Sequence, residues 1–232
     1  MFRRFWRKLI PTHAIFPLVM SGVVNMLAFY GPKLAQVFTG TARMHDLTTA
    51  LDEAIPFSPV WVIPYILTFA LWTYQYIMVT HDSEEMANRM FAADTLGKLV
   101  SMLFFIFYPT TNVRPEVTGS GLAPFLMRMI YTLDTPTNLL PSLHCFIAWL
   151  GTRLLWGCEH LPQRGLRCGL CTLGSVLVFL STLFTKQHVI YDVIAGVALA
   201  ELCYAAARWT KLPQLFGRAN RRFQKTKLAA IL

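Results

Sequence analysis

Charged side chains are scarce in this sequence, since Asp, Glu, Lys and Arg make up only 14% of its 232 residues. Hydrophobic residues make up 55%, and a soluble domain of this size would need a more polar surface. The net charge of +9 would by itself suit a nucleic-acid partner. The charges, however, cluster at the ends of apolar segments and in the tails. We therefore expect a single membrane domain and no nucleic-acid partner.

The sequence also lacks a disulfide framework and a recognisable metal motif. Its five cysteines lie in or beside apolar runs. Cys168 and Cys171 form a CxxC, but neither a second CxxC nor a nearby His/Cys cluster accompanies it. Small apolar residues near a helix end are the simpler interpretation. We expect no cofactor, and the sequence contains no internal repeat or low-complexity tract.

Apolar segments that reach, or nearly reach, the roughly 20 residues needed to cross a bilayer recur along the chain. They run over Ala14–Tyr30, Val60–Thr80, Met90–Tyr108, Leu143–Gly157, Gly169–Phe184 and Val189–Trp209, the fourth being short. We predict an all-α integral-membrane bundle of about six transmembrane helices. This domain covers residues 13–210, between an interfacial N-terminal segment (1–12) and a basic tail (211–232).

The N-terminal stretch MFRRFWRKLI places basic and aromatic residues before the first apolar segment. Such a start could belong to a signal peptide, but no clear small-residue cleavage site follows it, and several further spans do. We therefore expect an uncleaved first helix with an interfacial anchor on the cytoplasmic side.

The distribution of Lys and Arg predicts the orientation in the membrane. If the N-terminus is cytoplasmic, most of these residues fall on the inner side, and the outer side holds Lys33, Arg43, Arg114, Arg128 and Lys186. This bias indicates a multi-pass protein of the plasma or inner membrane with both termini in the cytoplasm. The basic tail could bind anionic headgroups, but a role as a topology determinant is sufficient to explain its charge.

One acid–base pair is expected within a span. Asp94 and Lys98 are four residues apart in the third apolar segment, so they share a helix face and can form an ion pair. We predict a structural role for this pair.

Three polar stretches meet on the outer side of the membrane in this topology. YPTTNVRPEV contains Arg114, DTPTNLLPSLHC contains Ser142 and His144, and STLFTKQHVIYDVIAG joins the fifth and sixth apolar segments. Because successive spans alternate in direction, all three stretches lie at the same end of the bundle. Each residue taken singly would suit an interfacial anchor. Together on one side, they favour a site.

The third stretch contains a His–Asp pair. His188 and Asp192 are four residues apart at the start of a helix, so they share one face. The carboxylate can keep one imidazole nitrogen protonated and leave the other as a nucleophile. With His144 as a second titratable group, the set suits phosphoryl transfer better than acyl transfer, which more usually employs a Ser or Cys nucleophile.

Candidate phosphate ligands accompany these histidines. Ser142 and the free N–H groups at the start of the fourth segment form a plausible anion seat, and Arg114 and Lys186 supply positive charge at the same depth. A zinc site that combines both histidines and their aspartate with Asp134 is the alternative. HExxH is absent and the two cations would repel a divalent ion, so we expect no metal.

In order and spacing these residues resemble the signature of the type 2 phosphatidic acid phosphatase superfamily, which reads KxxxxxxRP, PSGH and SRxxxxxHxxxD. This sequence reads FYPTTNVRP, PSLH and STLFTKQHVIYD, from Phe107 to Asp192. The family includes lipid phosphate phosphatases, undecaprenyl pyrophosphate phosphatases, vanadium haloperoxidases and, more distantly, inositol phosphorylceramide synthases. Its fold is an α-helical bundle, and the six-span layout is similar.

The resemblance implies a role for each matching residue. His188 would take the phosphoryl group, Asp192 would orient it, and His144 would protonate the leaving group and then activate the acceptor. Arg114 and Ser142 would bind phosphate oxygens, and the chemistry would need no metal.

The sequence departs from the signature at a few positions. Phe107 stands where the family has Lys, Leu143 where it has Gly, and Thr182 where it has Arg. Lys186 is then expected to replace one of the missing cations. PSLH together with TKQHxxxD looks closer to the inositol phosphorylceramide synthase-like branch, and fewer cations would suit a phosphodiester or a bulkier headgroup.

We therefore expect a metal-independent lipid phosphatase or phosphotransferase that acts on a phosphorylated lipid through a phosphohistidine at the extracytoplasmic face. The first alternative is a headgroup transferase, which would pass a phosphodiester-linked group to a lipid hydroxyl. The second alternative is a non-enzymatic lipid carrier with a decayed site. Product analysis with and without an acceptor lipid separates the two enzymatic hypotheses.

Overall fold

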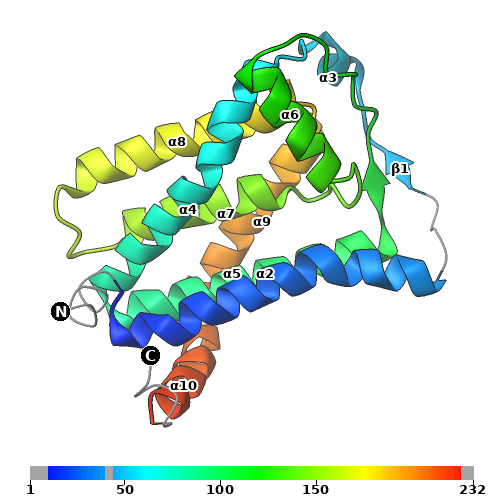
Figure 1. The fold of residues 1–232 in the computed structure, drawn as a ribbon. Helices are drawn as coiled ribbons and strands as arrows, with labels where there is room; N and C mark the ends of the chain where they lie inside the picture. Colours follow the sequence, from blue (N-terminus) through cyan, green and yellow to red (C-terminus); the bar gives the residue numbers. More distant parts are fainter. Residues whose placement is uncertain (1–9, 40–43, 226–232) are drawn as a thin grey trace.

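The structure, a computed structural model, describes residues 10–39 and 44–225 and is built almost entirely from helices (Figure 1). The long helices are α2 (Thr12–Thr39), α4 (Val62–Asp82), α5 (Glu84–Phe107), α8 (Arg164–Phe184) and α9 (Ile190–Trp209). All 5 are long and apolar enough to cross a membrane. Together with the shorter α7 (Leu143–Gly157), they confirm the predicted all-α membrane bundle.

Helix α7 is shorter than a usual span, yet it passes through the bundle. Its start is tied to the start of α9, because the N–H of Ser142 donates to the carbonyl of Asp192 at 3.0 Å. Its last residue, Gly157, lies beside Tyr204 near the end of α9 and Met86 at the start of α5. With 15 residues, α7 rises roughly 22 Å between these two points.

Short elements gather at one end of the bundle, which we call the cap end. They are α3 (Ala50–Ala54), η1 (Pro59–Trp61), α6 (Leu122–Leu133) and a parallel pair of two-residue strands, β1 (His45–Asp46) and β2 (Thr110–Thr111). Figure 1 shows α3, α6 and β1 at this end and α10 at the other. The apolar pattern predicts none of these elements, because each is too short to register as a span.

The opposite end, which we call the α10 end, carries α10 (Leu212–Gln224) within the expected basic tail. Arg221 and Arg222 lie in its last turn, where basic residues suit the helix dipole. The side chain of Asn220 is buried and donates to the carbonyl of His13 on α2 at 2.8 Å and to Asn88 Oδ1 on α5 at 3.3 Å. The first part of the tail is therefore a helix docked on the bundle.

Glycines allow close approach where α5, α7 and α9 meet. Gly97 of α5 faces the ring of Phe146 on α7, which fills the space that a Cβ would take. A Cβ at Gly196 of α9 would lie 2.6 Å from the carbonyl oxygen of Ser142 and 3.2 Å from the Cβ of Cys145. Small residues at helix interfaces are favoured in membranes because packing drives the association of helices there. Gly196 thereby sets α9 against the first turn of α7.

The ion pair expected in the third span is confirmed. Lys98 Nζ lies 2.8 Å from Asp94 Oδ2, and both side chains are buried. Tyr76 of α4 donates to Asp94 Oδ1 at 2.6 Å, and Ser21 of α2 donates to Asp94 Oδ2 at 2.6 Å. The pair therefore joins α2, α4 and α5 within the membrane domain.

Candidate active site

The loop between α8 and α9 holds His188 and Asp192 together at the cap end. A tight turn forms because the N–H groups of Gln187 and His188 both donate to the carbonyl of Thr182, at 2.9 and 3.1 Å. Asp192 then caps α9, since its Oδ2 accepts from the N–H of Val189 at 3.0 Å. The same oxygen lies 3.2 Å from Nδ1 of His188, which is 8% exposed. The predicted pairing is confirmed, and Nε2 is the ring nitrogen left for a substrate.

His144 faces this pair from the first turn of α7. Its ring centre lies 5.7 Å from that of His188. The rings of Tyr65 and Trp72 on α4 pack against it, with centres at 4.7 and 5.4 Å. These two residues lie in the first three turns of α4, so the site is recessed by roughly 5–15 Å from the start of that helix. Neither imidazole nitrogen of His144 has a hydrogen-bond partner among residues 10–39 and 44–225.

Ser142 links the start of α7 to α9. Its hydroxyl accepts from the N–H of Cys145 at 3.4 Å as an N-cap, and its own N–H donates to the carbonyl of Asp192 at 3.0 Å. The residue is fully buried. Ser142 thus caps α7 and joins it to α9, and the anion seat at this helix start stays a prediction.

Arg114 reaches the site from the loop after α5. Its Nη2 donates to Oε1 of Gln187 at 2.5 Å, its Nη1 donates to the carbonyl of Asp134, and its guanidinium lies 4.9 Å from the ring centre of Tyr131 on α6. Burial lowers the pKa of Arg114 from its ordinary value, although an arginine remains charged under ordinary conditions. Arg114 is thereby bonded to the residue directly before His188.

Gln187 is a site residue that the sequence analysis missed. It is 1% exposed, and its Nε2 has no partner within the described residues. The same is true of Nε of Arg114 and Oδ1 of Asp192, which are also buried. Buried polar atoms are normally hydrogen-bonded, so these atoms have hydrogen-bonding capacity left for a polar ligand or for water. The signal available in the sequence was the position of Gln187, immediately before His188.

Lys186 is bonded to the short elements at the cap end. Its backbone is left-handed, with a φ of 53°, and its Nζ donates to the carbonyls of Asp52 and Ile55 at 2.6 Å each. Burial lowers the pKa of the Lys186 ammonium. In return, Oδ1 of Asp52 accepts from the N–H of Ile190 at 2.7 Å and caps α9. These bonds join α3 and the residue after it to the loop that carries His188. The ammonium of Lys186 is therefore bonded to backbone carbonyls.

The positions at which the signature cations are missing supply no replacement. Phe107 ends α5 and is 79% exposed. Thr182 is fully buried, and its hydroxyl donates to the carbonyl of Phe179 at 2.8 Å. Leu143 is the first residue of α7. Among the residues matched to the signature, Arg114 is therefore the cation that is bonded to the loop carrying His188.

Of the four residues in the zinc alternative, His144, His188 and Asp192 lie together, whereas Asp134 pairs with a lysine. The carboxylate of Asp134 lies 3.7 Å from Nζ of Lys33. In the part of the chain that the structure describes, no group of three His, Cys, Asp or Glu side chains is arranged to hold a metal ion.

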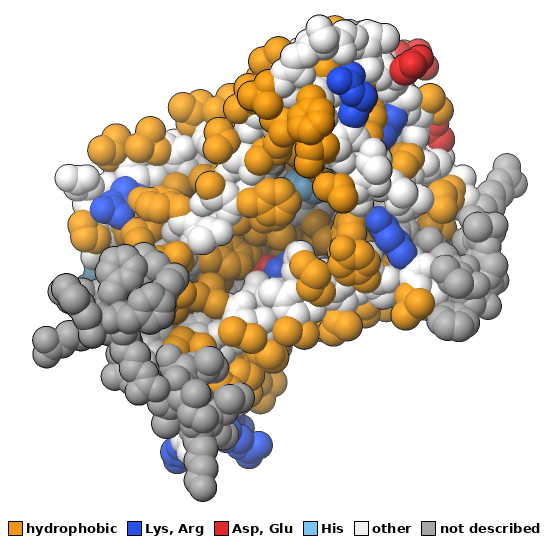
Figure 2. Space-filling view, in the orientation of Figure 1, with side chains coloured by type: hydrophobic (Ala, Val, Ile, Leu, Met, Phe, Trp, Pro, Cys, Tyr) orange, Lys and Arg blue, Asp and Glu red, His pale blue; other side chains and the backbone are white. Residues whose placement is uncertain are grey.

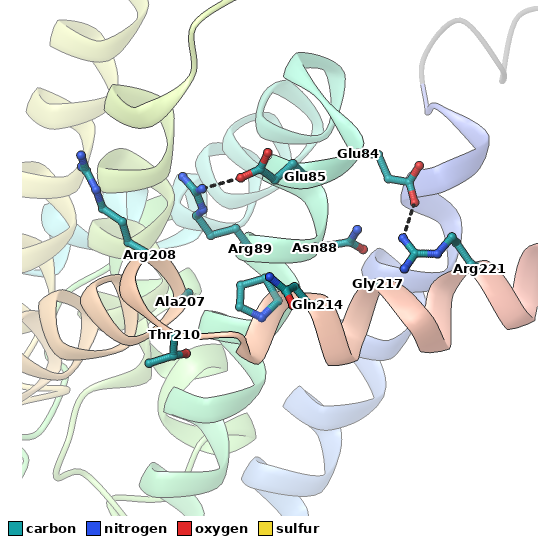
Figure 3. Close-up of a pocket in the computed structure, with 11 residues that line it drawn as sticks. Glu84, Glu85, Asn88, Arg89, Ala207, Arg208, Thr210, Gln214, Gly217 and Arg221 are labelled. Atoms are coloured by element: carbon teal, nitrogen blue, oxygen red, sulfur yellow. Dashed lines mark hydrogen bonds and ion pairs between the residues drawn. The ribbon is translucent and has the colours of Figure 1, made fainter.

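A cavity of about 540 Å³ opens at the α10 end, between α5, α9 and α10 (Figure 3). Both of its acidic side chains are paired with arginines: Arg89 lies 2.7 Å from Glu85, and Arg221 lies 4.0 Å from Glu84. His144 and His188 lie at the cap end of the bundle, so we do not assign the catalytic chemistry to this cavity.

The fold and the site together define a multi-pass helical membrane protein with a paired-histidine site at its cap end. No protein-family model, no curated protein and no solved structure matches this chain. The function is therefore argued from the site.

Proposed function

We propose that this protein is an integral-membrane lipid phosphatase or phosphotransferase that works through a phosphohistidine on His188. The observation that carries the proposal is the His188–Asp192 pair at 3.2 Å, with the His144 ring centre 5.7 Å from that of His188. A carboxylate that orients an imidazole leaves the other ring nitrogen as a nucleophile, and a second histidine at this range can handle protons. The resemblance to the type 2 phosphatidic acid phosphatase superfamily assigns the same roles.

In the first half-reaction, Nε2 of His188 attacks the phosphorus, and the bond from phosphorus to the leaving oxygen breaks. His144 starts protonated and gives its proton to that oxygen, so the lipid leaves as an alcohol. Asp192 accepts from Nδ1–H of His188 and stabilises the positive charge that develops on the imidazole. General acid catalysis of this kind contributes roughly 10²–10⁴-fold.

In the second half-reaction, the neutral His144 takes a proton from the acceptor while the acceptor oxygen attacks the phosphorus. The bond between nitrogen and phosphorus breaks, and His188 is regenerated. Water as the acceptor gives a phosphatase, whereas a lipid hydroxyl gives a transferase.

Phosphate binding is assigned to donors that are buried beside His188. Arg114 supplies charge, and its Nε and the Nε2 of Gln187 have no partner within the described residues. Donors held in advance by packing stabilise developing negative charge without reorganisation. The N–H groups at the start of α7 add to this set. Ser142 and Lys186 act through positioning, since the first caps α7 and the second is bonded to α3.

A headgroup transferase is the second candidate, and the small number of cations favours it. The buried Thr182 and the exposed Phe107 occupy the signature positions where cations are missing. A phosphodiester carries less negative charge than a terminal monoester and needs fewer cations. A non-enzymatic carrier remains a third outcome of the experiment below, and the intact histidine pair argues against it.

We place the site on the extracytoplasmic side of a plasma or inner membrane, with both termini in the cytoplasm. The support is the excess of Lys and Arg assigned to the α10 end by the order of the spans.

The test is turnover and covalent labelling of purified protein with labelled lipid phosphates and phosphodiesters, with and without an acceptor lipid. His188→Ala should abolish both turnover and label. With a substrate whose leaving group needs no proton, His144→Ala should accumulate an acid-labile, alkali-stable label on His188. Asp192→Asn should slow the reaction without removing the nucleophile. His160→Ala is the control, because His160 is exposed at the α10 end.

The pH profile should be bell-shaped, because His188 must be neutral and His144 protonated at the first step. A label on a residue other than His188, located by mass spectrometry, or full turnover by His188→Ala would overturn the proposal. Absence of any label or turnover on every substrate would favour the carrier.

A further inference from the structure

A groove runs between α2 and α4 from the candidate active site toward the α10 end. Its volume is about 420 Å³, and its apolar walls include Met26 of α2 with Phe69 and Ile77 of α4. Phe69 and Trp72, which both line it, lie with their ring centres 6.4 and 5.4 Å from that of His144. Figure 2 shows the surface hollowed between α2 and α4, with charged atoms at the floor. Because both helices cross the membrane, this groove meets lipid.

The charges at the floor of the groove cancel, and the Lys98 ammonium there already has its full set of hydrogen-bond acceptors. Lys98 lines it, and its Nζ contacts Asp94 Oδ2 at 2.8 Å, the carbonyl of Ser21 at 3.2 Å and Ser21 Oγ at 3.1 Å. An ammonium has three N–H donors, so none is left for a ligand. The part of a ligand that lies in this groove is therefore uncharged.

Two other polar atoms of the groove lack partners. Nε1 of Trp72 on α4 and Oδ1 of Asn25 on α2 are buried and have no hydrogen-bond partner within the described residues. An unpaired N–H in apolar surroundings is costly. Trp72 lies about ten residues after the start of α4, which is roughly 15 Å along the helix. Carbonyls of bilayer lipids at headgroup level do not reach this depth, so a partner has to enter the groove.

We propose that the groove binds the linkage region and one chain of an ester- or amide-linked acyl lipid, and that the indole N–H of Trp72 donates to its carbonyl. This rests on the proposed function, since the phosphate of the same molecule would lie at His188. The rings lie in a row: the ring centres of His188 and His144 are 5.7 Å apart, and those of His144 and Trp72 are 5.4 Å apart. In an acyl phospholipid, the phosphate, the leaving oxygen and the first carbonyl follow one another in the same order.

The size of the groove fits this occupant. A volume of about 420 Å³ holds about 14 methylene groups if each takes roughly the 30 Å³ of a water molecule. That is most of one acyl chain. A polyprenyl or alkyl-ether chain could fill the apolar part, but it would offer no carbonyl to Trp72. The groove therefore selects for the linkage as well as for the chain.

The experiment compares a diacyl glycerol phosphate with its dialkyl ether analogue of equal chain length. The native protein should favour the ester by about tenfold in kcat/KM, which is the order expected for one buried donor left unpaired. Trp72→Phe keeps a ring against His144 and removes the N–H, so turnover of the ester should fall to the ether level while the ether is unaffected. Trp156→Phe is the matched control, because its N–H is bonded to Thr172 Oγ1 of α8 at 3.2 Å and Trp156 does not line the groove.

Filling the groove provides a second variant that does not depend on Trp72. Gly22 lines the groove, and a Cβ there would meet no atom within 4 Å. Gly22→Leu should raise the KM for the ester by several-fold. Gly169→Leu on α8, where space is equally open, is its control and should leave turnover unchanged. Both changes raise helix propensity, so loss of folding is not expected.

Binding separates this inference from the proposed function. The His188→Ala variant should bind the ester more tightly than the ether by native mass spectrometry, and adding Trp72→Phe should remove the difference. If lipids bind in this way but no substrate is turned over, the proposed function is wrong and the assignment of the groove as an acyl-lipid site is kept. Equal handling of ester and ether by the native protein, or an equal effect of Trp72→Phe on both, would overturn the groove assignment.

Discussion

The substitution Gly196→Ala should move α9 away from α7 and so separate His188 from His144. A Cβ at position 196 would lie 2.6 Å from the carbonyl oxygen of Ser142, whereas ordinary contact begins at 3.4 Å, so the overlap is 3.4 − 2.6 = 0.8 Å. The atom in the way belongs to the backbone of the first turn of α7, and it cannot swing aside as a flexible side chain would. The overlap can be relieved only by displacing one helix from the other.

The magnitude follows from two opposed effects. Overpacking a tight interface costs about 1–3 kcal/mol, while alanine favours a helix over glycine by about 1 kcal/mol. The net loss of stability should therefore be about 0–2 kcal/mol. The effect on turnover should be larger, because a displacement of about 1 Å at reacting groups costs on the order of 10²-fold in rate.

The assay pairs thermal unfolding in detergent with phosphate release from the best lipid substrate. Gly196→Ala should lose turnover well beyond its loss of stability, and Gly196→Val should lose both. Gly169→Ala on α8 is the control, because its Cβ would meet no atom within 4 Å. It should unfold at the native temperature or slightly above and keep full turnover. The reasoning is refuted if Gly196→Ala unfolds like the native protein and turns over at the same rate.

Two further predictions concern the ion pair and the orientation. Asp94→Asn should destabilise the protein by about 3–5 kcal/mol, because it leaves the buried Lys98 without its counter-charge. The double variant with Lys98→Met should recover much of that loss in thermal unfolding, and a double variant no more stable than Asp94→Asn would contradict a structural pair. Single cysteines at Thr118 and Gln163, both exposed and at opposite ends, should react oppositely with an impermeant thiol reagent on intact cells. Since the native cysteines are all free, they should first be replaced, and labelling of both positions from outside would contradict the topology.

The spans could be predicted closely because lipid imposes a simple rule on sequence. The prediction of Val60–Thr80 corresponds to α4 at Val62–Asp82, and Leu143–Gly157 corresponds to α7 with the same bounds. The short elements of the cap could not be predicted in this way. They are stabilised by local capping, as in α3, where Thr49 and Asp52 cap each other, and by contacts with distant loops.

The two side-chain pairs spaced by four residues were predictable for a different reason. His188 with Asp192 and Asp94 with Lys98 are each spaced by four residues, and helix geometry alone brings such side chains together. The prediction needed only that both segments be helical at those positions.

The cations of the site illustrate what local spacing does not determine. Lys186 precedes His188 by two residues, yet its ammonium bonds to carbonyls 134 and 131 positions earlier in the chain. Arg114 reaches the histidines through Gln187, which is 73 positions away. Which of the two cations faces a substrate depends on how the cap packs, and no periodicity in the sequence carries that information.

The sequence by itself determined the membrane class, the spans and the His–Asp pair, because hydropathy and helix periodicity act over short stretches of chain. The tertiary structure alone decided that Gln187 joins the site, that Lys186 bonds to α3 and that α2 and α4 leave a groove beside His144. These features depend on contacts between segments far apart in the chain. Their geometry follows from the close approach that residues such as Gly196 allow, and from the places where neighbouring helices do not meet.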